Sequence, residues 1–282
     1  MIPFKTFIIE GSYKLSDAER KGIDEITNRY MIYFGPEKLT GMLGRQKNPE
    51  KVYKRELNER GEFFLGSIAF TDLADEEKGE QNVYVDVSFE QSRSRADYLE
   101  SDRKITLYYY TLGNESKSLI RSTILHEFLH AKQQYKKKGK EYVYATGKRT
   151  LPSGDVSMRS KRGYFLHPTE FPVHLSVIVD GIEQQYLNIV NKIDAAREQN
   201  NESEVKFWQR KKEGLLSFLK AYTTAGGRMS ADVPLPPFLN DQYDFINTLI
   251  KNRNNPKYKH LYQSFLKTLT KVYDQIKSYE QR

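Results

Sequence analysis

The chain has 282 residues, and its 45 Lys and Arg against 37 Asp and Glu leave a formal net charge of +8. It contains no cysteine, which excludes a disulfide framework, a cysteine-ligated zinc or iron–sulfur site and a thiol nucleophile. Any chemistry must therefore use histidine, carboxylate, hydroxyl or amine groups. The length suggests one or two domains.

The sequence contains no run of 18 apolar residues, so we expect no membrane span. The N-terminal segment 1–17 has a broken apolar run and no cleavage site of small residues, which argues against a secretory signal. We therefore expect a chain without membrane contact, located in the cytoplasm or carried in a virion. The oligomeric state is left open.

The N-terminal part opens with a short β-branched and aromatic segment, Phe4–Glu10, which predicts a strand. Ser16 with Glu19 three residues later is typical of a capping box that begins a helix. Apolar residues then recur at helical spacing up to Gly35 and Pro36, which end the helix. A second, more polar helix is expected over about residues 49–60.

From Glu62 the apolar period changes to two. The segments 62–70, 82–90 and 103–111 are rich in Val, Ile, Phe and Tyr, and each predicts a strand. In the second segment alternate residues share one face (Val83, Val85, Val87, Phe89) and those between them share the other (Tyr84, Asp86, Ser88). This alternation predicts a half-buried sheet.

The chain then becomes helical, with one helix expected over about residues 115–138. Further helices are expected over about 168–198, 202–222, 238–252 and 257–280. The pattern predicts an α+β fold in two parts, an N-terminal α+β part (1–163) and a helical C-terminal part (164–282). The aromatic residues of the last four helices recur at helical spacing and predict a core.

The central helix carries His126-Glu127-Phe128-Leu129-His130, which matches the pattern H-E-x-x-H. Residues four apart lie on one face of a helix, so both imidazoles can reach one ion while Glu127 points toward a metal-bound water. Zinc lowers the pKa of that water to about 7, and the glutamate can pass its proton to a leaving amine. The alternative is a histidine pair that merely caps or packs.

A catalytic zinc ion usually takes three protein ligands. The segment 164–174 offers His167, Glu170 and His174 as candidates for the third. Thr169 is a plausible N-cap, which would place Glu170 in the first turn of the next helix. Glu170 and His174 are four residues apart, so one can bind the metal while the other orients it. We favour Glu170, and the other two remain alternatives.

These residues resemble the zincin metallopeptidases of the gluzincin type, with phage and bacterial members. The resemblance rests on His126–His130 with Ala131 and Gln133, and on the Pro-x-Glu that ends at Glu170. It implies a zincin fold, zinc ligands His126, His130 and Glu170, and Glu127 as the general base. The chain departs from the family at Val173, where alanine is common.

Residues 136–163, which join the two ligand-bearing segments, hold nine basic and two acidic residues. This basic segment therefore carries +7 of the net charge of +8. It is interpreted as an electrostatic funnel or lid for an acidic polypeptide or a protein bound to nucleic acid. A solvated loop or an assembly contact is the alternative. Three tyrosines near the ligands are candidate oxyanion donors: Tyr142, Tyr144 and Tyr164.

Together these features predict a zinc-dependent metalloprotease that acts on a polypeptide. Two alternatives come from other classes of protein. One is a basic protein associated with nucleic acid, or a protease that acts on DNA-bound protein. The other is a virion or structural protein that retains a zincin fold.

Overall fold

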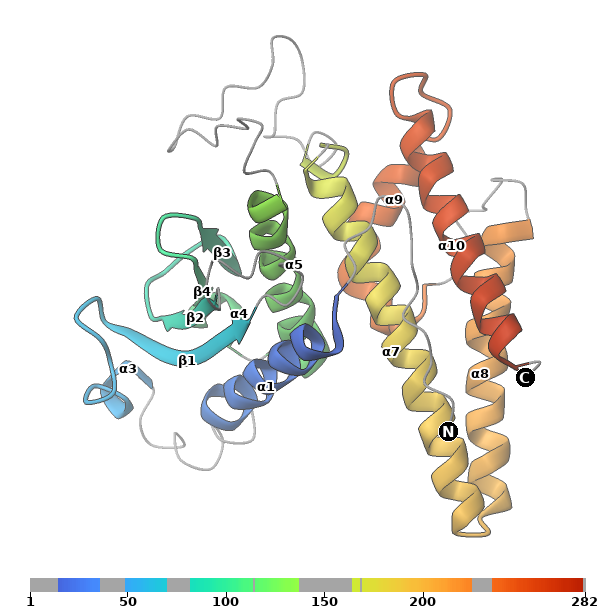
Figure 1. The fold of residues 1–282 in the computed structure, drawn as a ribbon, viewed down its shortest axis with the longest axis horizontal. Coiled ribbons are helices and arrows are strands. Elements are labelled where there is room, and N and C mark those ends of the chain that lie inside the picture. The colour runs from blue at the N-terminus through green and yellow to red at the C-terminus, as the bar shows by residue number, and fades with distance from the viewer. Residues whose placement is uncertain are drawn as a thin grey trace. The chain divides into compact units, whose positions relative to one another are not determined.

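The computed structural model describes residues 15–35, 49–69, 82–113, 115–136, 164–167, 169–224 and 235–280. The described residues up to 136 belong to one compact unit and those from 164 onward to another (Figure 1). The expected α+β class is confirmed, with a small mixed sheet and many helices. The strand predicted at Phe4–Glu10 and nearly all of the basic segment lie outside the described residues.

Helix α1 (Asp17–Phe34) begins at the predicted capping box. The Glu19 amide donates to Ser16 Oγ at 3.1 Å, and the Ser16 amide donates to Glu19 Oε2 at 2.9 Å. The helix ends at Gly35, whose amide donates to the Met31 carbonyl at 3.0 Å. Both ends of α1 therefore lie where the sequence predicted them.

The second predicted helix is wrong in its length. Helix α3 covers Pro49–Val52 alone, and turns follow it. The Asn58 Oδ1 accepts hydrogen bonds from the amides of Arg60, at 2.9 Å, and Glu62, at 3.0 Å. An asparagine that bonds to nearby amides competes with helical hydrogen bonds, so the chain turns here and enters the sheet.

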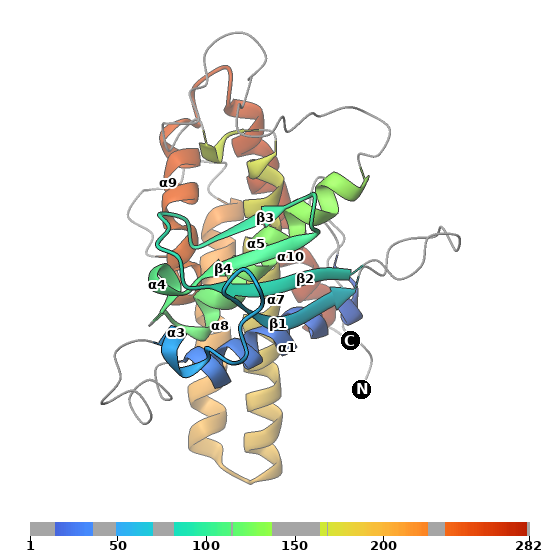
Figure 2. The same ribbon diagram turned by 90° about the vertical axis from the view of Figure 1, so that its left-hand side faces the viewer.

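The sheet has four strands: β1 (Glu62–Ala69), β2 (Asn82–Ser88), β3 (Ala96–Leu99) and β4 (Lys104–Tyr108). They lie in the order β1-β2-β4-β3, with β2 and β4 parallel and the other pairs antiparallel (Figure 2). Strand β3 was not predicted. The third predicted strand ends early, because its last residues form the one-turn helix α4 (Tyr109–Leu112).

One face of the sheet forms the core of this unit. Its central side chains are completely buried: Ile68, Val83, Val85, Val87, Ile105 and Leu107. Helix α1 packs against β1, and helix α5 (Lys117–Lys136) packs against β3 and β4. The alternation in the sequence thus correctly predicted the inner face.

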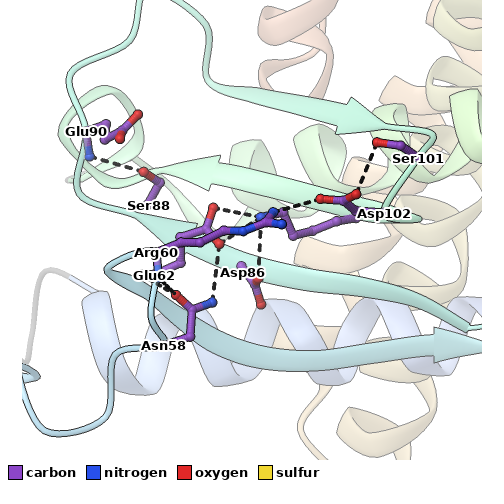
Figure 3. A network of polar contacts seen from close by, with 9 residues as sticks. Asn58, Arg60, Glu62, Asp86, Ser88, Glu90, Ser101 and Asp102 are labelled. Carbon is purple, nitrogen blue, oxygen red and sulfur yellow. Dashed lines mark hydrogen bonds and ion pairs between the residues drawn. The ribbon is translucent and has the colours of Figure 1, made fainter.

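On the opposite face, the prediction of a half-buried sheet holds for Tyr84 but not for the next two outward residues. Tyr84 is 46% exposed, whereas Asp86 and Ser88 are buried. The Lys104 ammonium donates to both Glu62 carboxylate oxygens, at 2.8 and 2.7 Å, and lies 3.8 Å from Asp86 Oδ2. Figure 3 shows the polar network to which these residues belong.

Burial raises the pKa of Asp86 to about 6, and the nearby Glu62 carboxylate adds to the shift. The Lys104 and Arg60 cations oppose this shift without cancelling it. The fold therefore keeps a carboxylate in an environment that disfavours its charge.

Helices α1 and α5 are joined by a completely buried ion pair. The Lys132 ammonium lies 2.7 Å from Glu19 Oε2, and the two side chains are 2% and 0% exposed. The same Oε2 accepts the Ser16 amide at the start of α1. At the surface, Arg121 Nε lies 2.7 Å from Asp24 Oδ1 and joins the same two helices.

The second unit is helical: α7 (Glu170–Glu198), α8 (Glu202–Thr224), η1 (Pro237–Gln242), α9 (Tyr243–Lys251) and α10 (Lys259–Glu280). These match the four predicted helices, except that the third begins as the 3₁₀ turn η1. Helices α7 and α8 lie side by side (Figure 1). The aromatic stripe is core as predicted, with Phe218, Tyr222, Phe245, Tyr262 and Phe265 buried. None of the described helices is both long and apolar enough to cross a membrane.

Replacing Lys132 with methionine should lower the free energy of unfolding by about 3 to 5 kcal/mol, because the Glu19 carboxylate stays buried without its cation. Urea denaturation measures this loss. Lys21→Met is the control, because Lys21 is 78% exposed and pairs with Glu25 at 3.8 Å. That variant should lose at most about 0.5 kcal/mol.

The double variant Glu19→Gln with Lys132→Met should recover most of the loss, since no buried charge remains. A single variant no less stable than Lys21→Met would contradict this account of the pair.

Asp86→Asn should be more stable than the wild type at pH 7.5, by up to about 3 kcal/mol. The pKa of Asp86 is raised from 3.8 to about 6, so the folded state favours the protonated acid. The wild type therefore loses stability relative to the variant as the pH rises from about 4 to about 6. Urea denaturation of both proteins at pH 4 and pH 7.5 measures their free energies of unfolding. If the two proteins differ by the same amount at both pH values, the raised pKa of Asp86 is contradicted.

Candidate metal centre

The H-E-x-x-H residues lie on α5, and the phase of this helix follows from its apolar side chains. Ser116 Oγ accepts the Leu119 amide at 3.2 Å and caps the start of the helix. Ile120, Ile124 and Phe128 are completely buried. The motif residues His126, Glu127 and His130 are all partly exposed. The apolar stripe thus fixes the helix against the core and leaves the motif accessible.

The two histidines form a close pair. Their Nε2 atoms are 3.0 Å apart, and their ring centroids are 4.7 Å apart with the planes at 75°. Two nitrogens bound to one tetrahedral zinc ion at 2.0–2.1 Å would be about 3.3 Å apart. The side chains of His126 and His130 therefore already have nearly the separation that a shared ion requires.

Gln133 fixes the orientation of the second imidazole. Its buried side-chain Oε1 lies 3.2 Å from His130 Nδ1. Because a carbonyl oxygen accepts and cannot donate, this hydrogen bond places the proton on Nδ1 and leaves the Nε2 lone pair for a metal. The sequence analysis missed this role, although the spacing of three residues on a helix could have indicated it.

Glu170 is the first residue of α7, as predicted, and it is 6% exposed. His126, His130 and Glu170 can each offer one ligand atom to a metal ion. Two imidazoles and a carboxylate form a donor set that suits zinc. These three residues are a group that could hold a metal ion.

His174 is not a member of this group and lies in the helical core. Its Nδ1 lies 2.9 Å from Gln242 Oε1. Its ring stacks on Phe245, with centroids 4.9 Å apart and planes at 20°, and it contacts Phe165 edge-on. These contacts account for the burial of His174 as a packing residue.

His167 is not a member either, and it organises the start of α7. Its Nδ1 lies 2.7 Å from Thr169 Oγ1, and its carbonyl accepts the amides of Glu170 and Phe171 at 3.1 and 3.0 Å. Thr169 occupies the predicted N-cap position, but it is helical in conformation and makes no side-chain cap bond. The His167 carbonyl takes that role.

Of the three candidate oxyanion donors, Tyr142 and Tyr144 lie outside the described residues. The Tyr164 ring packs edge-on against Phe165 and His174, with centroids 5.3 and 5.8 Å away. Its role as an oxyanion donor stays a prediction.

The chain matches no protein family, no curated protein and no solved structure in the comparisons made with each. The candidate centre is therefore assessed from its own geometry and chemistry.

The protein should bind one zinc ion per chain, and His130→Ala should weaken this binding more than about 100-fold. Gln133→Ala should weaken it about 10- to 100-fold, as expected for a residue that orients a ligand. Competition with a chelating dye measures both affinities. His260→Ala is the control, since His260 is exposed and lies on α10. Equal affinities for all four proteins would exclude the site.

Glu170→Gln should also weaken zinc binding, by at least about tenfold, because an amide oxygen is a poorer zinc ligand than a carboxylate. His174→Gln should keep the wild-type zinc affinity and lose only stability, since its ring packs in the core. The same dye competition compares the two variants, and the opposite result would make His174 the third ligand.

Proposed function

We propose that the protein is a zinc-dependent metalloprotease that hydrolyses peptide bonds. The observation that carries this proposal is the His126 and His130 pair with its Nε2 atoms 3.0 Å apart. Glu127 lies between them in the sequence, and Glu170 completes a group of potential ligands. The two Nε2 atoms are within hydrogen-bond distance of each other, and the same pair can bind one metal ion when neither nitrogen carries a proton.

In the proposed mechanism, a zinc ion would polarise the peptide carbonyl and lower the pKa of a water molecule to about 7. His126 and His130 would hold the ion through neutral Nε2 atoms, and Glu170 would supply a carboxylate oxygen. Glu127 accepts the proton of the attacking water and passes it to the leaving amine nitrogen. Gln133 holds His130 in the tautomer that this binding needs.

The surroundings of the motif support a zincin architecture. The helix α5 that carries the histidines packs against a small mixed sheet, as the resemblance implies. The family membership, the identity of the metal and the activity are parts of the proposal.

The proposed substrate is a polypeptide. The net charge of +7 in the basic segment favours an acidic polypeptide or one bound to nucleic acid. We propose that the protein acts in the cytoplasm or within a virion, in accordance with its lack of cysteine. No contact among the described residues favours the purely nucleic-acid-binding or structural alternatives.

Glu127→Gln should lower kcat/KM for peptide hydrolysis at least about 100-fold, because the amide cannot accept the proton. Its zinc content should be unchanged, since Glu127 is not a ligand. Cleavage of fluorescein-labelled casein, an acidic polypeptide, measures the rate, and atomic absorption measures the zinc. Glu25→Gln is the control, since this carboxylate is 55% exposed on α1.

A protein that binds zinc but cleaves neither casein nor a proteome-derived peptide library would overturn the proposal. In that case the metal would have a structural role, and the virion alternative would be favoured.

A further inference from the structure

The outer face of the sheet has a second polar site, separate in sequence from the metal ligands. An open hollow of about 540 Å³ lies over β1, β2, β4 and the turn before β1. We name it the sheet pocket and define it by Arg60, Glu62, Tyr84, Asp86, Asp102 and Lys104. Figure 3 shows most of its polar residues.

The cations of the sheet pocket already have partners. Both Glu62 oxygens accept from the Lys104 ammonium. The Arg60 guanidinium donates to Asp102 Oδ2 at 2.7 Å. A ligand therefore finds no unpaired cation among these residues, which argues against an anion.

Asp86 is different, because its buried Oδ1 receives no hydrogen bond from a donor group, and its side-chain hydrogen-bond neighbour is another carboxyl, that of Glu62. The residue is 6% exposed, and its other oxygen lies 3.8 Å from the Lys104 ammonium. A buried acceptor without a partner is costly to the fold. The missing partner must be a hydrogen-bond donor.

The charges around Asp86 favour a positively charged donor. Four carboxylates line the hollow (Glu59, Glu62, Asp86, Asp102), against the two cations Arg60 and Lys104. This local excess of negative charge contrasts with the net charge of +8 of the chain. A cation would offset the repulsion between Glu62 and Asp86.

Two aromatic rings at the same hollow favour an organic cation. Phe64 and Tyr84 are 55% and 46% exposed, and their ring centroids lie 6.4 Å apart. The faces of exposed aromatic rings attract alkylammonium and guanidinium groups. The described carboxylates of this hollow form no group of three converging ligand atoms like that at His126, so the site does not suit a metal ion.

We propose that the sheet pocket binds an alkylammonium or guanidinium group, which donates to Asp86 Oδ1 and packs against Tyr84 and Phe64. Lysine and arginine side chains of a polypeptide and free small amines share this chemistry. The proposal is independent of the metal centre, because none of the residues that carry it belongs to that centre.

Arg60 lines the sheet pocket together with Asp86. Its side chain reaches toward Asp102 across the network (Figure 3). The Arg60 and Asp102 side chains are 66% and 31% exposed, and such surface pairs contribute little to stability. The Arg60 side chain can therefore move aside and let the incoming cation reach the buried oxygen.

The test uses Nα-acetyl-arginine methylamide and Nα-acetyl-lysine methylamide, with the norleucine analogue as the uncharged control. Titration followed by ¹H–¹⁵N NMR should shift the amide signals of β1, β2 and β4 with the two charged probes. Asp86→Asn should weaken binding at least about tenfold, because a charge-assisted hydrogen bond is lost. Glu100→Gln, an exposed carboxylate outside the hollow, should leave it unchanged.

Tyr84→Ala is a second variant whose folding is not at risk, because this side chain is 46% exposed. It should weaken binding at least about threefold through the lost ring contact. Binding should also weaken about tenfold from pH 7.5 to pH 5.0, because the pKa of Asp86 is about 6. The other charged groups that face Asp86 are Glu62 on β1, Lys104 on β4 and Arg60.

The source of the cation is distinguished by a peptide that carries one arginine among neutral residues. Binding at least tenfold tighter than that of the capped amino acid identifies a polypeptide, and equal binding identifies a free amine. The proposal is overturned if neither charged probe shifts these signals, or if Asp86→Asn and Tyr84→Ala bind like the wild type. Shifts with CaCl₂ alone would also overturn it, since they would indicate an inorganic cation.

Discussion

The architecture around the candidate metal centre depends on the buried ion pair between Lys132 and Glu19. Lys132 follows His130 by two residues on α5, and its ammonium lies 2.7 Å from the Glu19 carboxylate on α1. A completely buried charge is tolerated only when its partner is correctly placed. The pair therefore restricts how α5 packs against α1. The Glu19 carboxylate also caps the start of α1. One carboxylate thus caps the start of α1 and joins α1 to α5 close to the histidines.

The same unit shows what happens when a buried carboxylate is less well paired. Glu19 has an ammonium at 2.7 Å, whereas the nearest ammonium to Asp86 is 3.8 Å away and already bonded to Glu62. Glu19 therefore holds its cation closely and is part of the framework, while Asp86, with its cation further away, keeps a raised pKa. Carboxylates of similar burial can thus serve stability or ligand binding, depending on the distance to the nearest cation.

Sequence patterns predicted the features that arise from neighbouring residues. The capping box of α1, the inner face of β2 and the helix that carries the two histidines all follow from spacings of two to four residues. Features that depend on contacts between residues far apart in the sequence could not be predicted from these short spacings. The sequence favoured Glu170 but left His174 as an alternative on the same helix face, and His174 is assigned to the core by Gln242, 68 residues further along the chain. The early end of α3 depends on how the Asn58 side chain bonds to its neighbours, and β3 is too short to show a clear period.

The Lys132 and Glu19 partners are 113 residues apart in the sequence, and this separation bears on the synthesis of the protein. The ribosome produces Glu19 early, and its carboxylate must stay hydrated until Lys132 has been made. The strands β3 and β4 join residues close in sequence and can pair sooner, because shorter loops close at a lower entropic cost. The unit that carries the histidines therefore cannot be completed before Lys132 has been made, nearly halfway along the 282-residue chain. Until then its nascent form exposes incomplete structure to chaperones.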